Sequence, residues 1–374
     1  MQLYLHIPFC KSKCAYCDFN SYACKDEASI LRYLTALNHE ILLAGKRFAK
    51  AKIDTVYIGG GTPSALDENK ISSVFNALEN SFDLSFVKEF SIECNPESIT
   101  AEKLALYKKY GVNRISIGVQ SLSDENLKII GRLHDANTAI EKIKLAKEFF
   151  DNVSCDLIIG LPFDTIDGIR EEVRTLCPLV EHISMYELSV EKGTRLERMI
   201  QNGKVTLPSD DDTQTLFDTA FDEAEKSGFK RYEVSNFAKN DKISLHNFGY
   251  WTREEYLGFG AGAHSLVKTV DGERELASET RYANLSKLDE YCAAVEEKKD
   301  YKDIVRKSVE TLTEKDVKNE TIMLGLRTHT GINKDLLGEI DDRLSVFFEE
   351  QNGKVRLTRD GVAVMNSILV EILD

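Results

Sequence analysis

The chain has 374 residues, of which 42% are apolar and 29% are charged, a composition typical of a globular protein with a sizeable core. The formal net charge of −14 disfavours nucleic acid as a partner, and the lysines near residue 300 alternate with acidic residues instead of forming a basic stripe. The sequence shows neither 18 consecutive apolar residues nor a basic, apolar leader. We therefore expect a cytoplasmic protein without a transmembrane helix or signal peptide.

Short and almost continuously apolar runs alternate with amphipathic helical patterns over the first two thirds of the chain. Such runs are typical of parallel strands that are covered on both faces. We predict strands at Leu3–Ile7, Thr55–Ile58, Phe90–Cys94, Arg114–Val119, Ser154–Ile159 and Ile183–Leu188. Helical periodicity lies between them, for example at Ile30–Leu43, Ile71–Leu78 and Ala139–Phe149. Repeated βα units predict an α/β fold with an open or closed barrel, whose site lies at the carboxyl ends of its strands.

The composition changes after about residue 190. Residues 229–264 are rich in aromatic side chains and end in a glycine-rich stretch, 258–264. From about residue 280 the sequence indicates charged helices, followed by a small hairpin strand at Gly353–Thr358 and a last helix. We therefore predict a first domain at 1–240, a connecting segment at 241–280 and a smaller, mainly helical domain at 281–374.

Three cysteines gather in the loop after the first predicted strand, as Cys10-x3-Cys14-x2-Cys17. Thiolates bind zinc or iron–sulfur clusters, and a structural zinc site would need Cys24 or His6 as a fourth ligand. A 4Fe-4S cluster held by three cysteines leaves one iron open to a chelating substrate. We favour the cluster over zinc. The other four cysteines are scattered and typical of small buried hydrophobic residues: Cys94, Cys155, Cys177 and Cys292.

The cysteine spacing resembles the signature of the radical S-adenosylmethionine superfamily. Gly59-Gly60-Gly61-Thr62, one βα unit later, resembles the second signature of that superfamily. The resemblance implies a partial (β/α)6 barrel of TIM-like type, with a 4Fe-4S cluster on the three cysteines. It also implies S-adenosylmethionine on the open iron, with the glycines allowing the backbone to approach the amino group of the methionine. The cofactors carry the chemistry, and the protein positions them and excludes water.

Longer stretches resemble the oxygen-independent coproporphyrinogen oxidase family: YLHIPFC at 4–10, SIECNP at 91–96, GVQS at 118–121, GRLH at 131–134, DLIIGLP at 156–162 and MLGLR at 323–327. The resemblance implies that a set of nine residues contacts S-adenosylmethionine: Tyr4, Tyr16, Gly60, Gly61, Thr62, Glu93, Gln120, Arg132 and Asp156. Their chemistry suits the cofactor, because Arg132 can pair with its carboxylate, Asp156 can accept from ribose hydroxyls and Glu93 can face its amine or sulfonium.

Two departures from the family weaken a decarboxylase interpretation. The decarboxylating enzymes carry a fourth cysteine where this chain has Phe19, and a longer segment ahead of the cysteine motif. The stretch from His246 to Trp251, HNFGYW, instead resembles the HNxxYW motif of the HemW-type heme chaperones. A neutral imidazole is a standard axial ligand of heme iron, and aromatic rings can pack on a porphyrin. A histidine beside aromatic residues is also an ordinary core residue, so this alternative stays open.

The resemblance thus implies a heme chaperone that delivers heme to apo-hemoproteins of the respiratory chain. The heme would be bound by four residues of the motif: His246, Asn247, Tyr250 and Trp251. Dependence on the cluster and a homodimer are further expectations. One alternative is a coproporphyrinogen III dehydrogenase, which removes hydrogen from propionate side chains, and another is a radical methyltransferase. We expect His264 to line the cofactor or heme cleft. The second axial ligand, and whether S-adenosylmethionine is cleaved or only bound, are left open.

Overall fold

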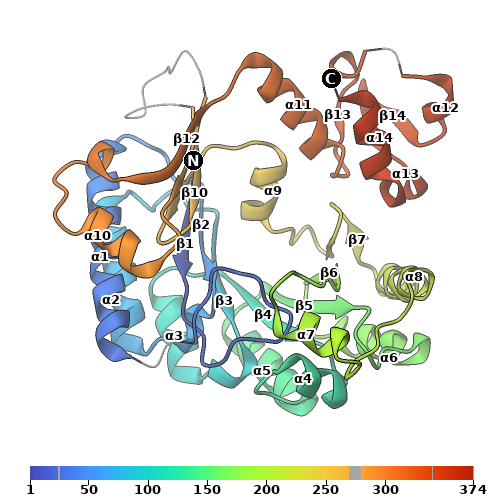
Figure 1. The fold of residues 1–374 in the computed structure, drawn as a ribbon, viewed down its shortest axis with the longest axis horizontal. Coiled ribbons are helices and arrows are strands. Elements are labelled where there is room, and N and C mark those ends of the chain that lie inside the picture. Colours follow the sequence, from blue (N-terminus) through green and yellow to red (C-terminus); the bar gives the residue numbers. More distant parts are fainter. Residues whose placement is uncertain (24–25, 269–278, 339, 374) are drawn as a thin grey trace.

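The computed structural model describes residues 1–23, 26–268, 279–338 and 340–373 (Figure 1). Cys24 and part of the predicted connecting segment lie outside the described residues. Within them, one twelve-stranded sheet has the order β12-β11-β10-β9-β1-β2-β3-β4-β5-β6-β8-β7. Its central strands are parallel: β1 (Gln2–Ile7), β2 (Thr55–Gly60), β3 (Glu89–Cys94), β4 (Arg114–Gln120), β5 (Val153–Ile159) and β6 (His182–Glu187). All six predicted strands are confirmed to within two residues of their bounds.

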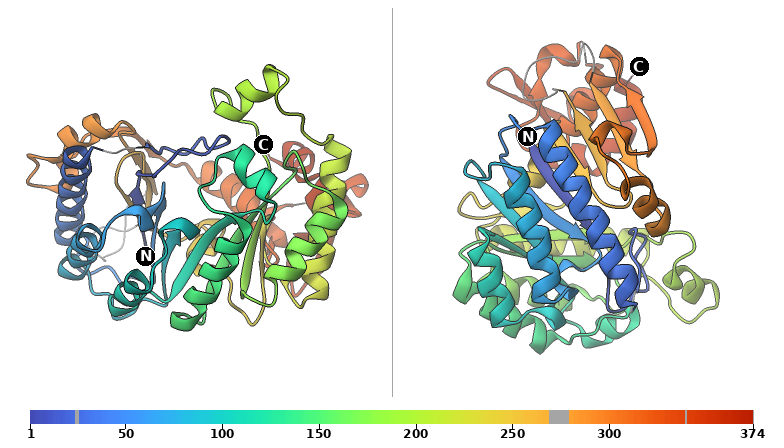
Figure 2. Two further views of the ribbon diagram at one scale, coloured as in Figure 1. Left: turned by 90° about the horizontal axis from the view of Figure 1, so that it is seen from below. Right: turned by 90° about the vertical axis from the view of Figure 1, so that its left-hand side faces the viewer.

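Helices connect the parallel strands and cover the outer face of the sheet. They are α1 (Glu27–Arg47), α2 (Glu68–Ser81), α3 (Ala101–Lys109), α4 (Asp124–Ile130), α5 (Ala136–Phe149) and α6 (Ile166–Leu176). Figure 2 shows α1 and α2 side by side over the sheet, and the two helices are in extensive contact. Each helix begins at an Asp, Ser or Thr whose side chain accepts a backbone N–H of the first turn, the interaction that fixes a helix start.

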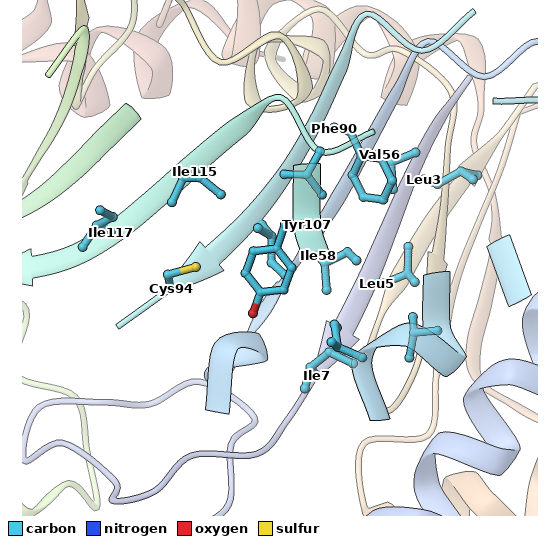
Figure 3. Packing of buried hydrophobic residues seen from close by; sticks show 14 of the residues in the cluster. Leu3, Leu5, Ile7, Val56, Ile58, Phe90, Cys94, Tyr107, Ile115 and Ile117 are labelled. Atoms are coloured by element: carbon cyan, nitrogen blue, oxygen red, sulfur yellow. The ribbon is translucent and has the colours of Figure 1, made fainter. Parts of the chain in front are cut away.

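The two faces of the parallel strands carry different side chains. The outer face forms an apolar layer under the helices, and the inner face is polar. Leu3, Leu5 and Ile7 of β1 are buried against the helices, with Val56 and Ile58 of β2 beside them (Figure 3). The alternate residues of these strands face inward, because successive strand side chains point to opposite faces. The inner face therefore carries polar side chains over a well-packed apolar layer, and it is there that a site forms.

Later elements extend the sheet at both edges. β8 (Asn236–Ala238) pairs antiparallel with β6, and β7 (Lys230–Arg231) follows it, after α7 (Arg195–Gln201) and α8 (Asp210–Lys226). On the other side β9 (Tyr256–Phe259) pairs parallel with β1. The sheet continues antiparallel through β10 (His264–Val267), β11 (Thr280–Asn284) and β12 (Arg306–Thr311), with α10 (Leu288–Val295) before β12. The sequence did not predict these edge strands.

The last part of the chain has a second apolar core. It comprises α11 (Glu314–Gly325), α12 (Asp342–Ser345), α13 (Arg359–Ala363) and α14 (Met365–Ile372), with a small sheet of β13 (Ile332–Asn333), β14 (Phe348–Gln351) and β15 (Lys354–Leu357). β15 confirms the predicted hairpin strand and α14 the predicted last helix. The three-part division of the chain stays a prediction. In the described ranges, no helix is long and apolar enough to cross a membrane.

Candidate cluster and cofactor site

A cavity of about 470 Å³ opens at the carboxyl ends of the parallel strands and extends along the inner face of the sheet. All three motif cysteines line it. It is also lined by eight of the nine residues predicted to contact S-adenosylmethionine: Tyr16, Gly60, Gly61, Thr62, Glu93, Gln120, Arg132 and Asp156. Tyr4 lines a second, adjoining cavity instead. The structure thus brings together residues that are more than 140 positions apart in the sequence.

Each cysteine thiol of the motif lies beside a polar donor. The Thr62 hydroxyl donates to Cys10 Sγ at 3.5 Å, and Arg132 Nη1 donates to Cys14 Sγ at 3.5 Å. Cys17 Sγ lies 3.7 Å from the Ser21 hydroxyl. All three are free thiols and partly exposed. Burial raises the pKa of Cys10, and the Thr62 bond opposes that rise. The donor set therefore fits an iron–sulfur cluster, which is bound by thiolates.

No three His, Cys, Asp or Glu side chains within the described ranges lie close enough together to hold a metal ion as they stand. The predicted alternative of a zinc site finds little support at His6. Its Nδ1 is 3.0 Å from the Tyr4 hydroxyl, and its Nε2 is 2.8 Å from the Asn20 carbonyl. Both nitrogens are engaged, so His6 does not offer a fourth zinc ligand in this conformation. The remaining candidate, Cys24, lies outside the described residues.

The cysteine loop is held by backbone hydrogen bonds to neighbouring elements. Ala15 N–H donates to the Ile130 carbonyl at 2.8 Å, and Leu196 N–H donates to the Ala15 carbonyl at 2.8 Å. These bonds tie the middle of the motif to the end of α4 and the start of α7. The four other cysteines are buried, as predicted, and Cys94 lies in the apolar layer with Ile115 and Ile117 (Figure 3).

The glycine turn after β2 passes close to the backbone at the end of β1. Gly61 N–H donates to the Ile7 carbonyl at 2.8 Å, and a Cβ on Gly61 would lie 2.9 Å from that oxygen. Gly60 has φ +113°, a conformation that suits only glycine. A Cβ there would also lie 2.4 Å from the His6 ring. The turn therefore requires glycine at both positions and exposes backbone to the cavity.

Two half-buried carboxylates line the cavity. Glu93 accepts from the Tyr57 hydroxyl at 2.8 Å and from Gly60 N–H at 2.9 Å. Burial raises the pKa of Glu93 to about 7, against the lowering effect of these two bonds. Burial likewise raises the pKa of Asp156 to about 6, opposed by its hydrogen bond to Ser184. Acidic groups that line a cavity suit a cationic ligand with hydroxyls, as the resemblance implies for these two positions.

Arg132 crosses the cavity toward the cysteine loop. Its Nη2 donates to the Gly118 carbonyl at 2.5 Å and to Asn95 Oδ1 at 2.9 Å. Its Nε is buried and has no hydrogen-bond partner among the described residues. A buried donor without a partner is costly, so this Nε is placed to bind an added acceptor such as a carboxylate. Gln120 adopts φ 74° at the end of β4, an uncommon conformation of the kind found at ligand sites.

The HNxxYW residues lie on α9 (Leu245–Trp251), at the opposite end of the strands from the cysteines. Glu89, the first residue of β3, accepts the backbone N–H groups of Leu245 and His246 at 2.8 and 3.0 Å. His246 Nδ1 is 2.8 Å from the hydroxyl of Thr55, the first residue of β2. Figure 1 shows α9 between the main sheet and α11, and it contacts both β2 and α11.

His246 is fully buried in this conformation. Besides the Thr55 contact, its Nε2 is 2.9 Å from the Tyr250 hydroxyl, and its ring stacks on Tyr57 with the centroids 5.1 Å apart. Burial lowers the pKa of His246 to about 3, so the ring is neutral at ordinary pH. Both nitrogens are therefore occupied, and neither faces a cavity. An iron would reach this imidazole only after the Thr55 or Tyr250 bond breaks.

The other three motif residues lie in three different surroundings. Asn247 lines the first cavity, at the end far from the cysteines. Tyr250 lines the second cavity. Trp251 lines neither, and its ring lies 5.8 Å from the Arg327 guanidinium. The motif is thus a shared wall between the cavities rather than a single open binding surface.

The second cavity has a volume of about 380 Å³ and adjoins the first, with Phe19, Gly60 and Glu93 lining both. Its remaining lining comes from β1, the loop after it, α9, β9, the turn before β10 and the first residue of β10: Tyr4, His6, Asn20, Tyr250, Tyr256, Gly262, Ala263 and His264. His264 lies at a cleft, as expected from the glycine-rich stretch. Aromatic and imidazole rings are the main side chains of this cavity.

Thr55 and Tyr57 are site residues that the sequence did not single out. They lie on β2 with Val56 between them in the apolar layer, so they share the inward face of the strand. Period-two alternation along the predicted strand would have placed Tyr57 on the same face as the glycine turn. Nothing in the sequence indicates that Thr55 contacts His246, because that contact spans 191 positions.

Residues 4–176 match the radical SAM superfamily. The chain is 36% identical to the heme chaperone HemW of Bacillus subtilis, over 90% of this chain and 86% of that protein. It is 32% identical to a mitochondrial radical S-adenosyl methionine domain-containing protein 1 of Bos taurus, over 99% of this chain and 87% of that protein. The fold matches coproporphyrinogen III oxidase HemN of Escherichia coli with a TM-score of 0.83 at 22% identity, covering 100% of this chain and 89% of that chain. The chain belongs to the HemW family of the radical SAM superfamily.

Proposed function

We propose that this protein is a heme chaperone, which binds heme and delivers it to apo-hemoproteins such as those of the respiratory chain. The observation that carries the proposal is the 36% identity to a protein named heme chaperone HemW over nine tenths of the chain. The HNxxYW helix supports it, because its Tyr250 forms part of an aromatic-walled cavity beside the cofactor site. A cytoplasmic location and a homodimer belong to the same proposal.

Membership of the radical SAM superfamily implies a 4Fe-4S cluster and S-adenosylmethionine as cofactors. We assign the cluster to Cys10, Cys14 and Cys17, whose thiols line one cavity. When bound, this pair of cofactors supplies reductive cleavage of a carbon–sulfur bond. The nine residues named from the family would hold S-adenosylmethionine, with Arg132 Nε donating to its carboxylate and Asp156 accepting from its ribose. The backbone of the glycine turn and Glu93 would face its amino group.

Heme contact by the HNxxYW residues is part of the proposal, and the geometry suggests how they share it. Tyr250 presents its ring to the second cavity, and its hydroxyl is fixed by His246 Nε2. Tyr256 packs edge-on against Tyr250 with the ring centroids 4.8 Å apart. His246 in its buried position therefore orients an aromatic wall. It would become an iron ligand only through a rearrangement of α9.

Phe19 argues against the coproporphyrinogen dehydrogenase alternative. It occupies the position of the fourth cysteine of the decarboxylating enzymes, and 69% of its surface is exposed. An exposed aromatic ring at the rim of both cavities suits contact with a flat apolar ligand. The similarity to HemN is a similarity of fold at 22% identity.

The test is an anaerobic titration of the cluster-reconstituted protein with hemin, followed by the Soret band. A parallel incubation contains coproporphyrinogen III, S-adenosylmethionine and a reductant. The proposal predicts saturation near one heme per chain and no protoporphyrinogen. Catalytic formation of protoporphyrinogen would establish the dehydrogenase, and methyl transfer to an added acceptor would establish the methyltransferase. Absence of saturable hemin binding would refute the chaperone.

A further inference from the structure

His264 differs from the other six histidines of the chain in having two open ring nitrogens. The others each hold at least one hydrogen bond from the ring: His6, His39, His134, His182, His246 and His329. Among the described residues no hydrogen bond reaches the His264 ring, and the side chain is exposed. An imidazole with a free nitrogen is the form that binds a metal.

The position of His264 is fixed by its backbone. It is the first residue of β10 and pairs with Ala283 of β11. Gly258 of β9 passes so close that a Cβ on it would lie 2.0 Å from the His264 carbonyl oxygen. The preceding turn uses Gly260 and Gly262, with φ +101° and +75°. His264 therefore belongs to a strand that is held between β9 and β11. A side chain on a rigid element is held more precisely for binding than one on a loop.

His264 lines the second cavity, whose other side chains are largely aromatic. Tyr250 and Tyr256 line it from α9 and β9, and the exposed ring of Phe19 stands at its rim. Its volume of about 380 Å³ falls in the usual range for cavities that hold small molecules and cofactors. Flat aromatic walls around one open imidazole match a planar, apolar ligand that carries a metal at its centre.

Two cationic side chains of the neighbouring strands lie near the His264 ring. Lys307 of β12 is exposed and makes no ion pair within the described ranges, and Arg281 of β11 is paired with Glu320 at 2.7 Å. Burial lowers the pKa of the His264 imidazole, and the charges of Lys307 and Arg281 lower it further. The ring is therefore neutral at pH 7. The Lys307 ammonium can pair with the carboxylate of a propionate.

We propose that His264 is an axial ligand of the heme iron in the second cavity, with Tyr250, Tyr256 and Phe19 against the porphyrin. This inference rests on the proposed heme-chaperone function and names the residue that binds the iron. The imidazole nitrogen donates its lone pair to the iron in place of a water molecule, and no electron is transferred. Gly60 and Glu93 line both cavities, so the heme abuts the cofactor site.

The experiment is a hemin titration of the anaerobically reconstituted full chain as wild type, His264→Ala, His246→Ala and His39→Ala. His39 on α1 is the matched control, because its ring is hydrogen-bonded to the Lys298 carbonyl and it lines neither cavity. Metal-free protoporphyrin IX, followed by fluorescence, is the second probe. We expect His264→Ala to lose at least about tenfold in hemin affinity and the Soret band of the imidazole-ligated wild type. It should retain protoporphyrin binding, and added imidazole should restore the band.

The outcomes separate the inference from the function on which it rests. Wild-type-like hemin binding by His264→Ala, with the loss in His246→Ala instead, would overturn the inference and leave the chaperone standing. Equal loss of hemin and of metal-free protoporphyrin in His264→Ala would also overturn it, because the role would then be structural. Failure of the wild type itself to bind hemin would refute the proposed function.

Discussion

The Tyr57 hydroxyl donates a 2.8 Å hydrogen bond to the Glu93 carboxylate, while the ring of the same tyrosine stacks on His246. One residue of β2 thus joins the cofactor end of the parallel strands to the HNxxYW helix at their other end. Glu93 in turn accepts from Gly60 N–H in the glycine turn. The three contacts form a continuous link through the interior, so changes at either end of the strands can be tested for effects at the other.

Glu93 should make stability fall as pH rises. Its pKa is raised from 4.5 to about 7 in the folded state, so the folded protein binds the proton more tightly than the unfolded chain. The stabilisation is complete below pH 4.5 and is lost as pH rises through 7. Glu93→Gln removes this dependence. In denaturant unfolding of the cluster-free protein, we expect wild type to lose on the order of 3 kcal/mol relative to the variant between pH 5 and 8. Parallel pH curves would contradict this.

The three motif cysteines should be required for iron, and the buried cysteines should not. Cys14→Ala removes one thiolate beside Arg132, and we expect reconstituted protein to hold far less iron and sulfide than wild type. Cys292→Ala is the control, because Cys292 is buried in α10 outside both cavities. Chemical analysis of iron and sulfide, together with electron paramagnetic resonance, measures the cluster content of each protein. Full cluster content in Cys14→Ala would remove this cysteine from the ligand set.

Arg132→Lys should weaken S-adenosylmethionine binding by about tenfold or more. A lysine keeps the charge but loses the fork that reaches Gly118, Asn95 and Cys14 together, and it removes the unpaired Nε. Equilibrium dialysis with the labelled cofactor measures the affinity. Arg174→Lys, an exposed arginine paired with Glu223, is the matched control and should bind as wild type. Equal affinities for all three proteins would exclude Arg132 from the cofactor site.

Replacing His246 should cost far more stability than replacing His264. His246→Ala leaves a cavity and strips the Thr55 and Tyr250 hydroxyls of a partner, so we expect a loss of about 2–4 kcal/mol in the free energy of unfolding. His264→Ala removes an exposed ring without hydrogen bonds and should cost less than about 0.5 kcal/mol. Urea unfolding of the two variants beside wild type gives both numbers. Comparable losses would mean that His246 is not packed as described.

The central sheet could be predicted because its six parallel strands are apolar and separated by helical patterns. The edge strands could not. β9 pairs with β1 across some 250 residues, and β12 is polar and largely exposed, so neither carries a strong local signal. Their pairing depends on the finished sheet, which the sequence pattern does not contain.

The cofactor residues could be named because the motifs that carry them follow predictable strands. What the sequence could not supply is the state of each side chain. HNxxYW suggests an available imidazole, yet both ring nitrogens and one face of His246 are in contact with other side chains. Thr55 and Tyr57 come from β2, and Tyr250 lies one turn further along α9. For His264 the sequence showed only that it ends a glycine-rich stretch. Only the structure shows that its ring makes no hydrogen bond to the described residues, whereas the rings of the other histidines do.

Heme transfer is the most direct test of the proposed chaperone function. Chain loaded with one equivalent of heme under anaerobic conditions is mixed with an apo-hemoprotein, and the acceptor spectrum is followed against the same acceptor mixed with an equal amount of heme-loaded albumin. We expect heme to leave this protein for the acceptor stoichiometrically, faster than from albumin, and only when the cluster is present. Heme that stays bound, or a transfer rate that is the same without the cluster, would contradict it.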